Sequence, residues 1–402
     1  MHCLVSCACA LAAFAASAAA PVPVSSFGYD PEDATACFQK ALDSDEPKLV
    51  VDFRPGGWNV GPLKLTRPNL ELVLAPGVVV RAKKGAFIDG HDTLLSIEAG
   101  ARNVTVRGGE GSGFAMNKKD YADRSRYAFS THRHAIALRG CRNVTLCNLT
   151  ISDAGGDDIY VYRPVDTLIE NVTCTGAFRD AMSVIAAERL TVRNCRFVGT
   201  SGTAPNCGVD VESNNPSDFL VDILFEKCLF KGNAASGFCV HLPGLDSGSR
   251  PVSITVRKCE MTENNVDGIV TFASRPDSPV AGRVVFENCI SKGNRRSALH
   301  LANHEERSFK ADFKDCTFDG RGGISPTVAL ANSQISEDFA GVAFNNCRVF
   351  SDTPDRTYSY SGMTGTGVTD VRGAWSVVSP GEEKSFDLSV LKARHPSDPS
   401  VR

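Results

Sequence analysis

The sequence predicts an all-β solenoid, a single coil whose turns stack as parallel sheets behind one short capping helix. Three observations predict it: a motif recurs eight times, each copy alternates apolar and polar residues like a strand, and no helical run interrupts the series. With 35 Gly, 42% hydrophobic and 22% charged residues, the chain has the composition of a folded protein with many turns. The formal net charge of −3 disfavours nucleic acid as a partner.

The first element is an expected export signal in residues 1–20. The stretch from Cys3 to Ala20 is uncharged, rich in Ala, Cys and Leu, and ends in small residues before Pro21. Beyond residue 20 no apolar run approaches the ~18 residues that span a bilayer. We therefore expect a monomer without a transmembrane segment, secreted or periplasmic after signal cleavage.

Both ends of the coil are expected to be covered, because the first and last turns have no neighbour on one side. Residues 21–44 supply the N-terminal cover: from Pro31 to Ser44, apolar residues fall on one helical face, at Ala34, Cys37, Phe38 and Leu42. Residues 351–402 lose the repeat and become rich in Ser, Thr, Gly and Pro. We expect them to form a C-terminal cap and a tail.

Residues 45–350 contain the repeat. Equivalent positions in successive copies lie 23 to 33 residues apart, from Leu149 in the first copy to Cys347 in the last. A second alternating segment precedes most copies, such as Val209 to Val211 and Leu299 to Leu301. Two or three short strands a turn, separated by Gly, Asn and Asp, predict one continuous coil.

The repeat brings like residues into columns. Rungs lie about 4.8 Å apart, and adjacent parallel rungs rarely give disulfide geometry. We therefore expect a ladder of free, buried thiols, formed by Cys195, Cys228, Cys259, Cys289, Cys316 and Cys347. The Asn that precedes several of these positions is interpreted as a stacked turn residue, at Asn148, Asn171, Asn194 and Asn288.

Two parts of the chain carry a family resemblance. Phe53 to Leu63 (FRPGGWNVGPL) is similar to the first coils of polygalacturonases, and Gly155 to Val161 (GGDDIYV) with Gly208 to Glu212 (GVDVE) is similar to a bacterial carbohydrate-active group. Over roughly residues 28–350 the chain resembles the right-handed parallel β-helix proteins of the pectin-lyase-like superfamily. The resemblance implies that fold and an activity on polysaccharides. The polygalacturonase motifs Asn-Thr-Asp, Gly-His-Gly and Arg-Ile-Lys do not follow in order.

Registering the strands of three successive coils predicts a cluster of four carboxylates, formed by Asp157, Asp180, Asp210 and Glu212. The rung spacing would place them within about 5 to 10 Å of one another. Carboxylates so close resist joint ionisation, which provides a general acid beside a general base. Inverting glycosidases need such a pair. We predict these four as the catalytic residues of a glycoside hydrolase acting on an acidic, plant or algal polysaccharide.

Eight further residues are predicted to bind substrate along the same outward face. Arg179 would hold an acidic sugar, and tyrosine rings would stack on sugar faces. The full set is Arg133, His134, Asp158, Tyr160, Tyr162, Arg179, His241 and His300. The segment 109–132 is rich in Lys, Arg, Asp and Tyr and is expected to wall one side of this groove.

Two alternatives stay open. The same oxygens could hold Ca²⁺, which takes six to eight hard ligands, in a lyase that uses Arg179 or another base beside a uronate carboxylate. The aspartates could instead only cap turns, in a non-catalytic carbohydrate-binding protein. Apart from Ca²⁺ we expect no cofactor, since the sequence has no zinc-type spacing, phosphate-binding loop or serine nucleophile motif.

Overall fold

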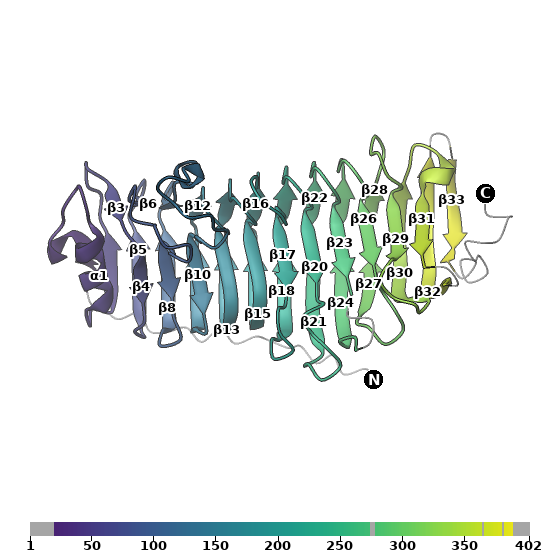
Figure 1. Ribbon diagram of the computed structural model, residues 1–402, viewed down its shortest axis with the longest axis horizontal. Coiled ribbons are helices and arrows are strands. Elements are labelled where there is room, and N and C mark those ends of the chain that lie inside the picture. The colour runs from purple at the N-terminus through teal and green to yellow at the C-terminus, as the bar shows by residue number, and fades with distance from the viewer. Residues whose placement is uncertain (1–19, 274–277, 364–365, 380–381, 389–402) are drawn as a thin grey trace, which may run out of the picture.

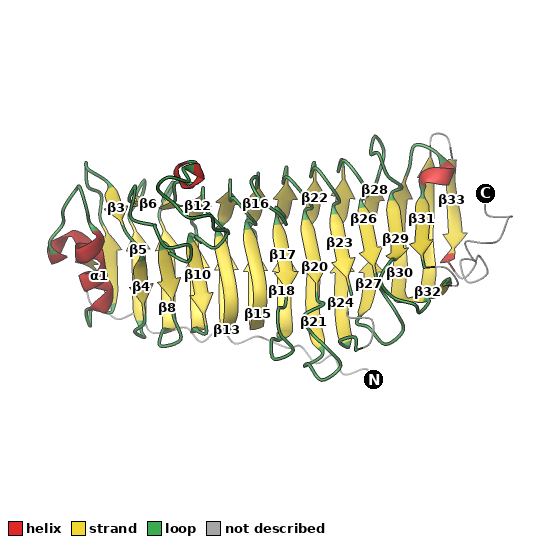
Figure 2. Cartoon of the chain, viewed as in Figure 1, coloured by secondary structure: helices red, strands yellow, loops and turns green. Residues whose placement is uncertain are grey.

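The computed structural model describes residues 20–273, 278–363, 366–379 and 382–388. Strands stack along one long axis, with the helix at the N-terminal end (Figure 1). Strands make up most of the regular structure (Figure 2). The expected export signal lies outside the described residues apart from Ala20. In the part of the chain that the structure describes, no helix is long and apolar enough to cross a membrane.

The strands form three columns of parallel pairs, which we name sheets 1, 2 and 3. Sheet 1 consists of β4 (Leu63–Leu65), β7 (Leu95–Ile97), β10 (Ile136–Arg139), the first halves of β13 (Ile159–Glu170) and β15 (Met182–Arg193), β17 (Val209–Glu212), β20 (Phe238–His241), β23 (Ile269–Phe272), β26 (Leu299–Ala302), β29 (Val328–Asn332) and β31 (Tyr358–Gly362). Sheet 2 consists of β1 (Val22–Pro23), β2 (Lys48–Val51), β5 (Leu70–Leu74), β8 (Arg102–Gly108), β11 (Arg142–Cys147), the second halves of β13 and β15, β18 (Leu220–Glu226), β21 (Val252–Arg257), β24 (Gly282–Glu287), β27 (Lys310–Lys314) and the first halves of β30 (Phe339–Phe350) and β32 (Val368–Ser379). Sheet 3 consists of β3 (Trp58–Val60), β6 (Val79–Ala82), β9 (Gly113–Ala115), β12 (Thr150–Ser152), β14 (Thr173–Thr175), β16 (Arg196–Val198), β19 (Leu229–Lys231), β22 (Glu260–Thr262), β25 (Ile290–Lys292), β28 (Thr317–Asp319) and the second halves of β30 and β32.

Short helices lie at the ends and in loops: η1 (Val24–Phe27), α1 (Thr35–Asp43), η2 (Asp120–Ala122) and η3 (Pro354–Arg356). The predicted capping helix corresponds to α1, which buries Cys37, Phe38, Ala41 and Leu42. The Phe38 ring packs edge-on against Trp58 of the first coil, with centroids 5.6 Å apart. The helix therefore covers the apolar end of the stack, as expected.

The polar residue that precedes each inward position of the repeat is a turn residue. The residue before each inward Cys or apolar position has a left-handed backbone, with φ between 52 and 57° at Asn148, Asn171, Asn194, Lys227, Lys258, Asn288, Asp315 and Asn346. Asn and Asp tolerate this region better than other side chains with a Cβ. Asn171 also donates from Nδ2 to Oδ1 of Asn148, at 3.1 Å. The interpretation of this column as stacked turn residues is confirmed.

The cysteine column is buried and unbridged, as predicted. All six ladder cysteines are free and at most 3% exposed. Their sulfurs are directed toward backbone carbonyls; Sγ of Cys259, for example, lies 3.3 Å from the Arg257 oxygen. Phenylalanines stack beside the ladder, as where Phe286 lies 5.1 Å from Phe313 at an interplanar angle of 11°.

Two expected boundaries differ from the structure. The coil does not stop at residue 350, because β31 continues sheet 1 and β32 pairs with β30. Only β33 (Glu382–Asp387) departs from the parallel pattern, since it pairs antiparallel with β32. Nor does the segment 109–132, expected to wall the groove, lie wholly outside the coil, because it contains β9, which pairs with β6 and β12.

Candidate active site

The four predicted carboxylates meet on sheet 1. Ile159 pairs with Met182, and Met182 pairs with Val209, so the residues two positions before the starts of β13 and β15 occupy matching corners of neighbouring coils. Those corner residues are Asp157 and Asp180. Asp210 and Glu212 lie two residues apart on β17 of the next coil. Because alternate strand residues share a face, both extend from one side of β17.

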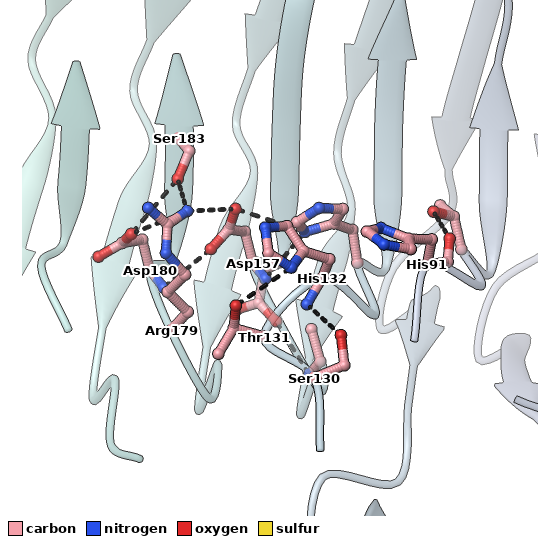
Figure 3. Close-up of polar contacts among 12 residues, drawn as sticks. His91, Ser130, Thr131, His132, Asp157, Arg179, Asp180 and Ser183 are labelled. Atoms are coloured by element: carbon pink, nitrogen blue, oxygen red, sulfur yellow. Dashed lines mark hydrogen bonds and ion pairs between the residues drawn. The ribbon is translucent and has the colours of Figure 1, made fainter. Parts of the chain in front are cut away.

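Arg179 joins the carboxylates (Figure 3). Its Nη1 lies 3.3 Å from Oδ2 of Asp157 and 3.6 Å from Oδ2 of Asp180, and its Nη2 donates to Oε1 of Glu212. The same Nη1 donates to Ser183 Oγ at 3.2 Å. Burial acts to lower the pKa of Arg179, but the charges of the three carboxylates outweigh it and raise the pKa. Arg179 is therefore the counter-charge of the whole cluster.

Asp157 and Asp180 lie beneath this guanidinium and are fully buried. Oδ1 of Asp157 accepts the backbone N–H of Asp180 at 3.1 Å, and Oδ1 of Asp180 accepts that of Cys207 at 2.7 Å. Burial raises the pKa of Asp157 to about 6, against the opposing charge of Arg179. Burial and the neighbouring charges of Asp157 and Asp210 raise the pKa of Asp180 well above its usual range. Each carboxylate thus bonds the backbone of the next coil.

Asp210 and Glu212 lie closest to solvent. Asp210 is 2% exposed, and its Oδ1 has no hydrogen-bond partner among the described residues. Burial, followed by the charge of Glu212, raises the pKa of Asp210 well above the usual range. The side chain of Glu212 is 16% exposed. The cluster therefore places a buried carboxyl group with a raised pKa beside a partly exposed carboxylate that pairs with Arg179.

His134 supports the site from below. Its ring is 1% exposed and stacks on Tyr160, with centroids 4.5 Å apart and planes 12° apart. Nδ1 accepts the backbone N–H of Asp157 at 3.1 Å, so the ring proton sits on Nε2. Burial, with the charge of Arg139, lowers the pKa of His134 well below 6.5, so its 3.4 Å contact with the Asp157 carboxylate involves a neutral ring. The predicted substrate contact of His134 is corrected, because Tyr160 covers the ring.

Arg133 is also a structural residue. It is fully buried and donates from Nε to the Phe87 oxygen at 2.9 Å and from Nη2 to the oxygens of Ile88 and Ala128, both at 3.1 Å. Its guanidinium lies over the rings of Tyr121 and Tyr127. Arg133 therefore ties two loops together, and its expected role in substrate binding is wrong.

Asp158 is corrected for the same reason. It is fully buried, and its Oδ1 accepts the backbone N–H of Ala154 at 3.2 Å. Burial raises the pKa of Asp158 well above its usual range. The carboxyl group closes the turn that precedes β13 and does not face solvent.

The remaining predicted binding residues lie on the outward face. Tyr160 and Tyr162 are half-buried, with ring centroids 6.5 Å apart. His241 is exposed and pairs in register with Glu212, as expected. His300 lies three rungs along the column of Asp210, and its Nδ1 is 3.2 Å from Oδ2 of Asp267.

Three residues at the site are not among the predicted site residues. Ser183 bonds both Arg179 and Oδ2 of Asp180, and it pairs in register with Asp210. His132 is exposed, with its ring 6.0 Å from His134 and 5.2 Å from His91 (Figure 3). Register alone places Ser183 beside Asp210, so the column alignment contained that signal. His91 comes from a loop 41 residues earlier, which no periodicity links to the site.

Comparisons with known proteins support the fold. The family whose model matches the chain is described as a right handed beta helix region, over residues 84–244. The SPbeta prophage-derived uncharacterized protein YorA of Bacillus subtilis (strain 168) is 22% identical over 309 residues, which cover 67% of this chain and 49% of that protein. The chain thus spans about half the length of this relative.

Solved structures agree. A polygalacturonase from Erwinia carotovora ssp. carotovora matches with a TM-score of 0.58 and 14% identity, covering 85% of this chain and 95% of that one. PfbA, a surface adhesin of Streptococcus pneumoniae, matches with a TM-score of 0.57 and 12% identity, covering 90% and 89%. The predicted right-handed parallel β-helix is confirmed.

Proposed function

We propose that the protein, a right-handed parallel β-helix of the pectin-lyase-like superfamily, is a glycoside hydrolase that cleaves a polysaccharide. The observation that carries the proposal is a buried carboxyl group with a raised pKa, Asp210, two residues from an Arg-paired carboxylate, Glu212. Hydrolysis of a glycosidic bond needs a proton donor for the leaving oxygen and a carboxylate for the other face of the sugar.

Asp210 is the proposed general acid. Burial and the charge of Glu212 raise the pKa of Asp210 and so favour its protonated form, which a general acid requires. Its buried Oδ1 has no hydrogen-bond partner among the described residues, so a glycosidic oxygen that reached it would supply one. Glu212 extends from the same face of β17, since alternate strand residues share a face, so both carboxyl groups would meet one substrate.

Glu212 is the proposed second carboxylate, as base or nucleophile. Arg179 supplies positive charge to it and, through the same guanidinium, to Asp157. Asp157, Asp180 and Ser183 then serve as positioning residues, since they hold Arg179 in place without reaching solvent. Of the four residues expected to be catalytic, we therefore propose only Asp210 and Glu212 as catalytic.

Tyr160 and Tyr162 would supply the surface for sugar rings beside this pair. Arg139 lies over the Tyr160 ring at 4.9 Å, and Arg163 lies over Tyr162 at 5.2 Å. Stacked aromatic rings with nearby guanidinium groups favour a sugar polymer that carries negative charge. We propose an acidic polysaccharide on this ground.

A non-catalytic carbohydrate-binding protein is the second candidate. The observation that favours it is that Asp157 and Asp180 each bond a backbone N–H of the following coil, as turn caps do. A calcium-dependent lyase has less support, because Arg179 occupies the centre of the carboxylates. Among the residues that the structure places, no group of three or more His, Cys, Asp or Glu side chains could hold a metal ion.

The test is digestion of a panel of neutral and acidic polysaccharides, with chromatography and detection of unsaturated products. We expect saturated oligosaccharides from the wild type, and rates about 10² to 10⁴ lower in Asp210→Asn and Glu212→Gln. Asp222→Asn is the matched control, since Asp222 is exposed on β18 of the same coil. Unsaturated products would indicate the lyase, and sugar binding without cleavage would indicate the binding protein.

A further inference from the structure

Two buried cysteines outside the ladder lie side by side next to the carboxylate cluster. Sγ of Cys207 is 3.0 Å from Sγ of Cys239. Cys207 is 3% exposed and precedes β17 by two residues, and Cys239 is 9% exposed in β20 of the next coil. Neither residue belongs to the repeat position that forms the inward ladder.

The geometry of this pair differs from that of the ladder. Ladder cysteines share one column, so their Cα–Cβ bonds run parallel and disulfide geometry is rarely reached. Cys207 and Cys239 come from different columns, since Cys239 is in register with Asp210, three residues beyond Cys207. Their side chains therefore approach from different backbone positions and meet sulfur to sulfur.

The backbone brings these two coils close together at Gly208. A Cβ at Gly208, next to Cys207, would lie 2.5 Å from the carbonyl oxygen of Gly237 and 2.7 Å from Nδ2 of Asn233. Only a residue without a side chain fits there. Gly208 thus allows the close approach of the coils that carry the two sulfurs.

We propose that Cys207 and Cys239 form a disulfide under oxidising conditions, with a small-molecule disulfide such as glutathione disulfide as the oxidant. One cysteine, as thiolate, attacks the oxidant and releases one glutathione thiol. The second then displaces the other glutathione, so one S–S bond breaks, one forms, and each cysteine loses its proton. Because both thiols are buried, the exchange takes place while these coils are still open, during folding.

The bond would lie directly beside the cluster. The backbone N–H of Cys207 donates to Oδ1 of Asp180 at 2.7 Å, and Cys239 neighbours Asp210 in register. A disulfide would therefore fix the coil that carries Asp210 and Glu212 to the next coil. The inference concerns only the sulfur pair and holds whether or not the cluster is catalytic.

The test is disulfide mapping of the full chain after refolding in a glutathione redox buffer. The sample is quenched in acid, alkylated, digested without reduction and analysed by mass spectrometry. We expect a cross-linked peptide containing Cys207 and Cys239, with Cys228 and Cys259 of the ladder alkylated as thiols. Alkylation of Cys207 and Cys239 to the same extent as the ladder pair would overturn the proposal.

Thermal unfolding supplies a second measurement. The oxidised wild type should unfold a few degrees above the reduced protein, because the bond restricts the unfolded chain. This redox shift should vanish in Cys239→Ser and persist in Cys228→Ser, the ladder control. If Cys239→Ser fails to fold, Cys207→Ser gives the same comparison. A shift equal in the wild type and in both variants at this pair would contradict the assignment.

Discussion

Asp210 occupies a position where a carboxyl group weakens the fold. It is buried, one oxygen lacks a partner, and the negative charge of Glu212 is close. Burying a polar group without a hydrogen bond costs free energy, and a raised pKa means that the ionised form of Asp210 is less favourable in the folded chain than in the unfolded chain. Groups that destabilise a protein in this way are typical of functional sites.

The pH dependence of stability follows from the upward direction of the Asp210 pKa shift. Below about pH 4 Asp210 is protonated in both the folded and the unfolded chain, so its ionisation does not lower the free energy of unfolding. As pH rises through the unfolded pKa, the unfolded chain ionises first, so the free energy of unfolding falls, and Asp157 adds to the fall up to about pH 6. Asp210→Asn should match the wild type near pH 4 and be more stable at pH 7, measured by urea unfolding at each pH. Asp222→Asn should show no difference, and a less stable Asp210→Asn at pH 7 would contradict the argument.

At the scale of elements, a charge ladder runs along sheet 2. Registered residues of six successive coils alternate in sign: Glu170, Arg193, Glu226, Arg257, Glu287 and Lys314. Neighbours form ion pairs, with Arg193 and Glu170 2.7 Å apart and Arg257 and Glu226 2.9 Å apart. Opposite charges across paired strands stabilise a sheet, and like charges destabilise it.

Reversing one charge of this ladder tests its contribution. Glu226→Lys would place a cation between Arg193 and Arg257, and we expect a loss of about 1–2 kcal/mol in the free energy of unfolding. The loss should shrink in high salt, since these side chains are partly exposed. Glu226→Gln, which removes attraction without adding repulsion, should lose less. Equal, salt-independent losses in both variants would show that packing, not charge, is responsible.

Arg133 stabilises the loops beside the site through its buried hydrogen bonds. It holds the carbonyls of Phe87, Ile88 and Ala128, so Arg133→Met would leave buried acceptors without a donor. We expect a loss of about 2–4 kcal/mol and faster proteolysis between residues 116 and 132, with the strand signal in circular dichroism retained. Arg139→Met, at a half-buried arginine on β10, is the control. Unchanged proteolysis would contradict the role given to Arg133.

Across the whole molecule, the sequence predicted best what the coil repeats. Asp157 with Asp180 and Glu212 with His241 could be aligned because each strand keeps the period of two and each coil repeats its corners. Arg133, His134 and Asp158 could not be oriented, because their burial depends on contacts outside the period: the loop carbonyls bonded by Arg133, the Tyr160 ring over His134 and the Ala154 N–H bonded by Asp158. The charged residues of the charge ladder also recur in the sequence, two positions before each inward residue, but no role was predicted for them. The buried Asn233, Asn264 and Asn294, which bond one another, were not predicted either.

The alternation of sign in the charge ladder restricts how this molecule could change length. Removing one coil, for example residues 228–258, would bring Glu226 against Glu287, whereas removing two, residues 228–288, would bring Glu226 against Lys314. Any odd number of coils lost or gained within the ladder leaves one like-charged contact, and any even number leaves none. The solenoid therefore has a parity. Duplication or deletion of coils within the charge ladder avoids a like-charged contact only when the coils are added or removed in pairs.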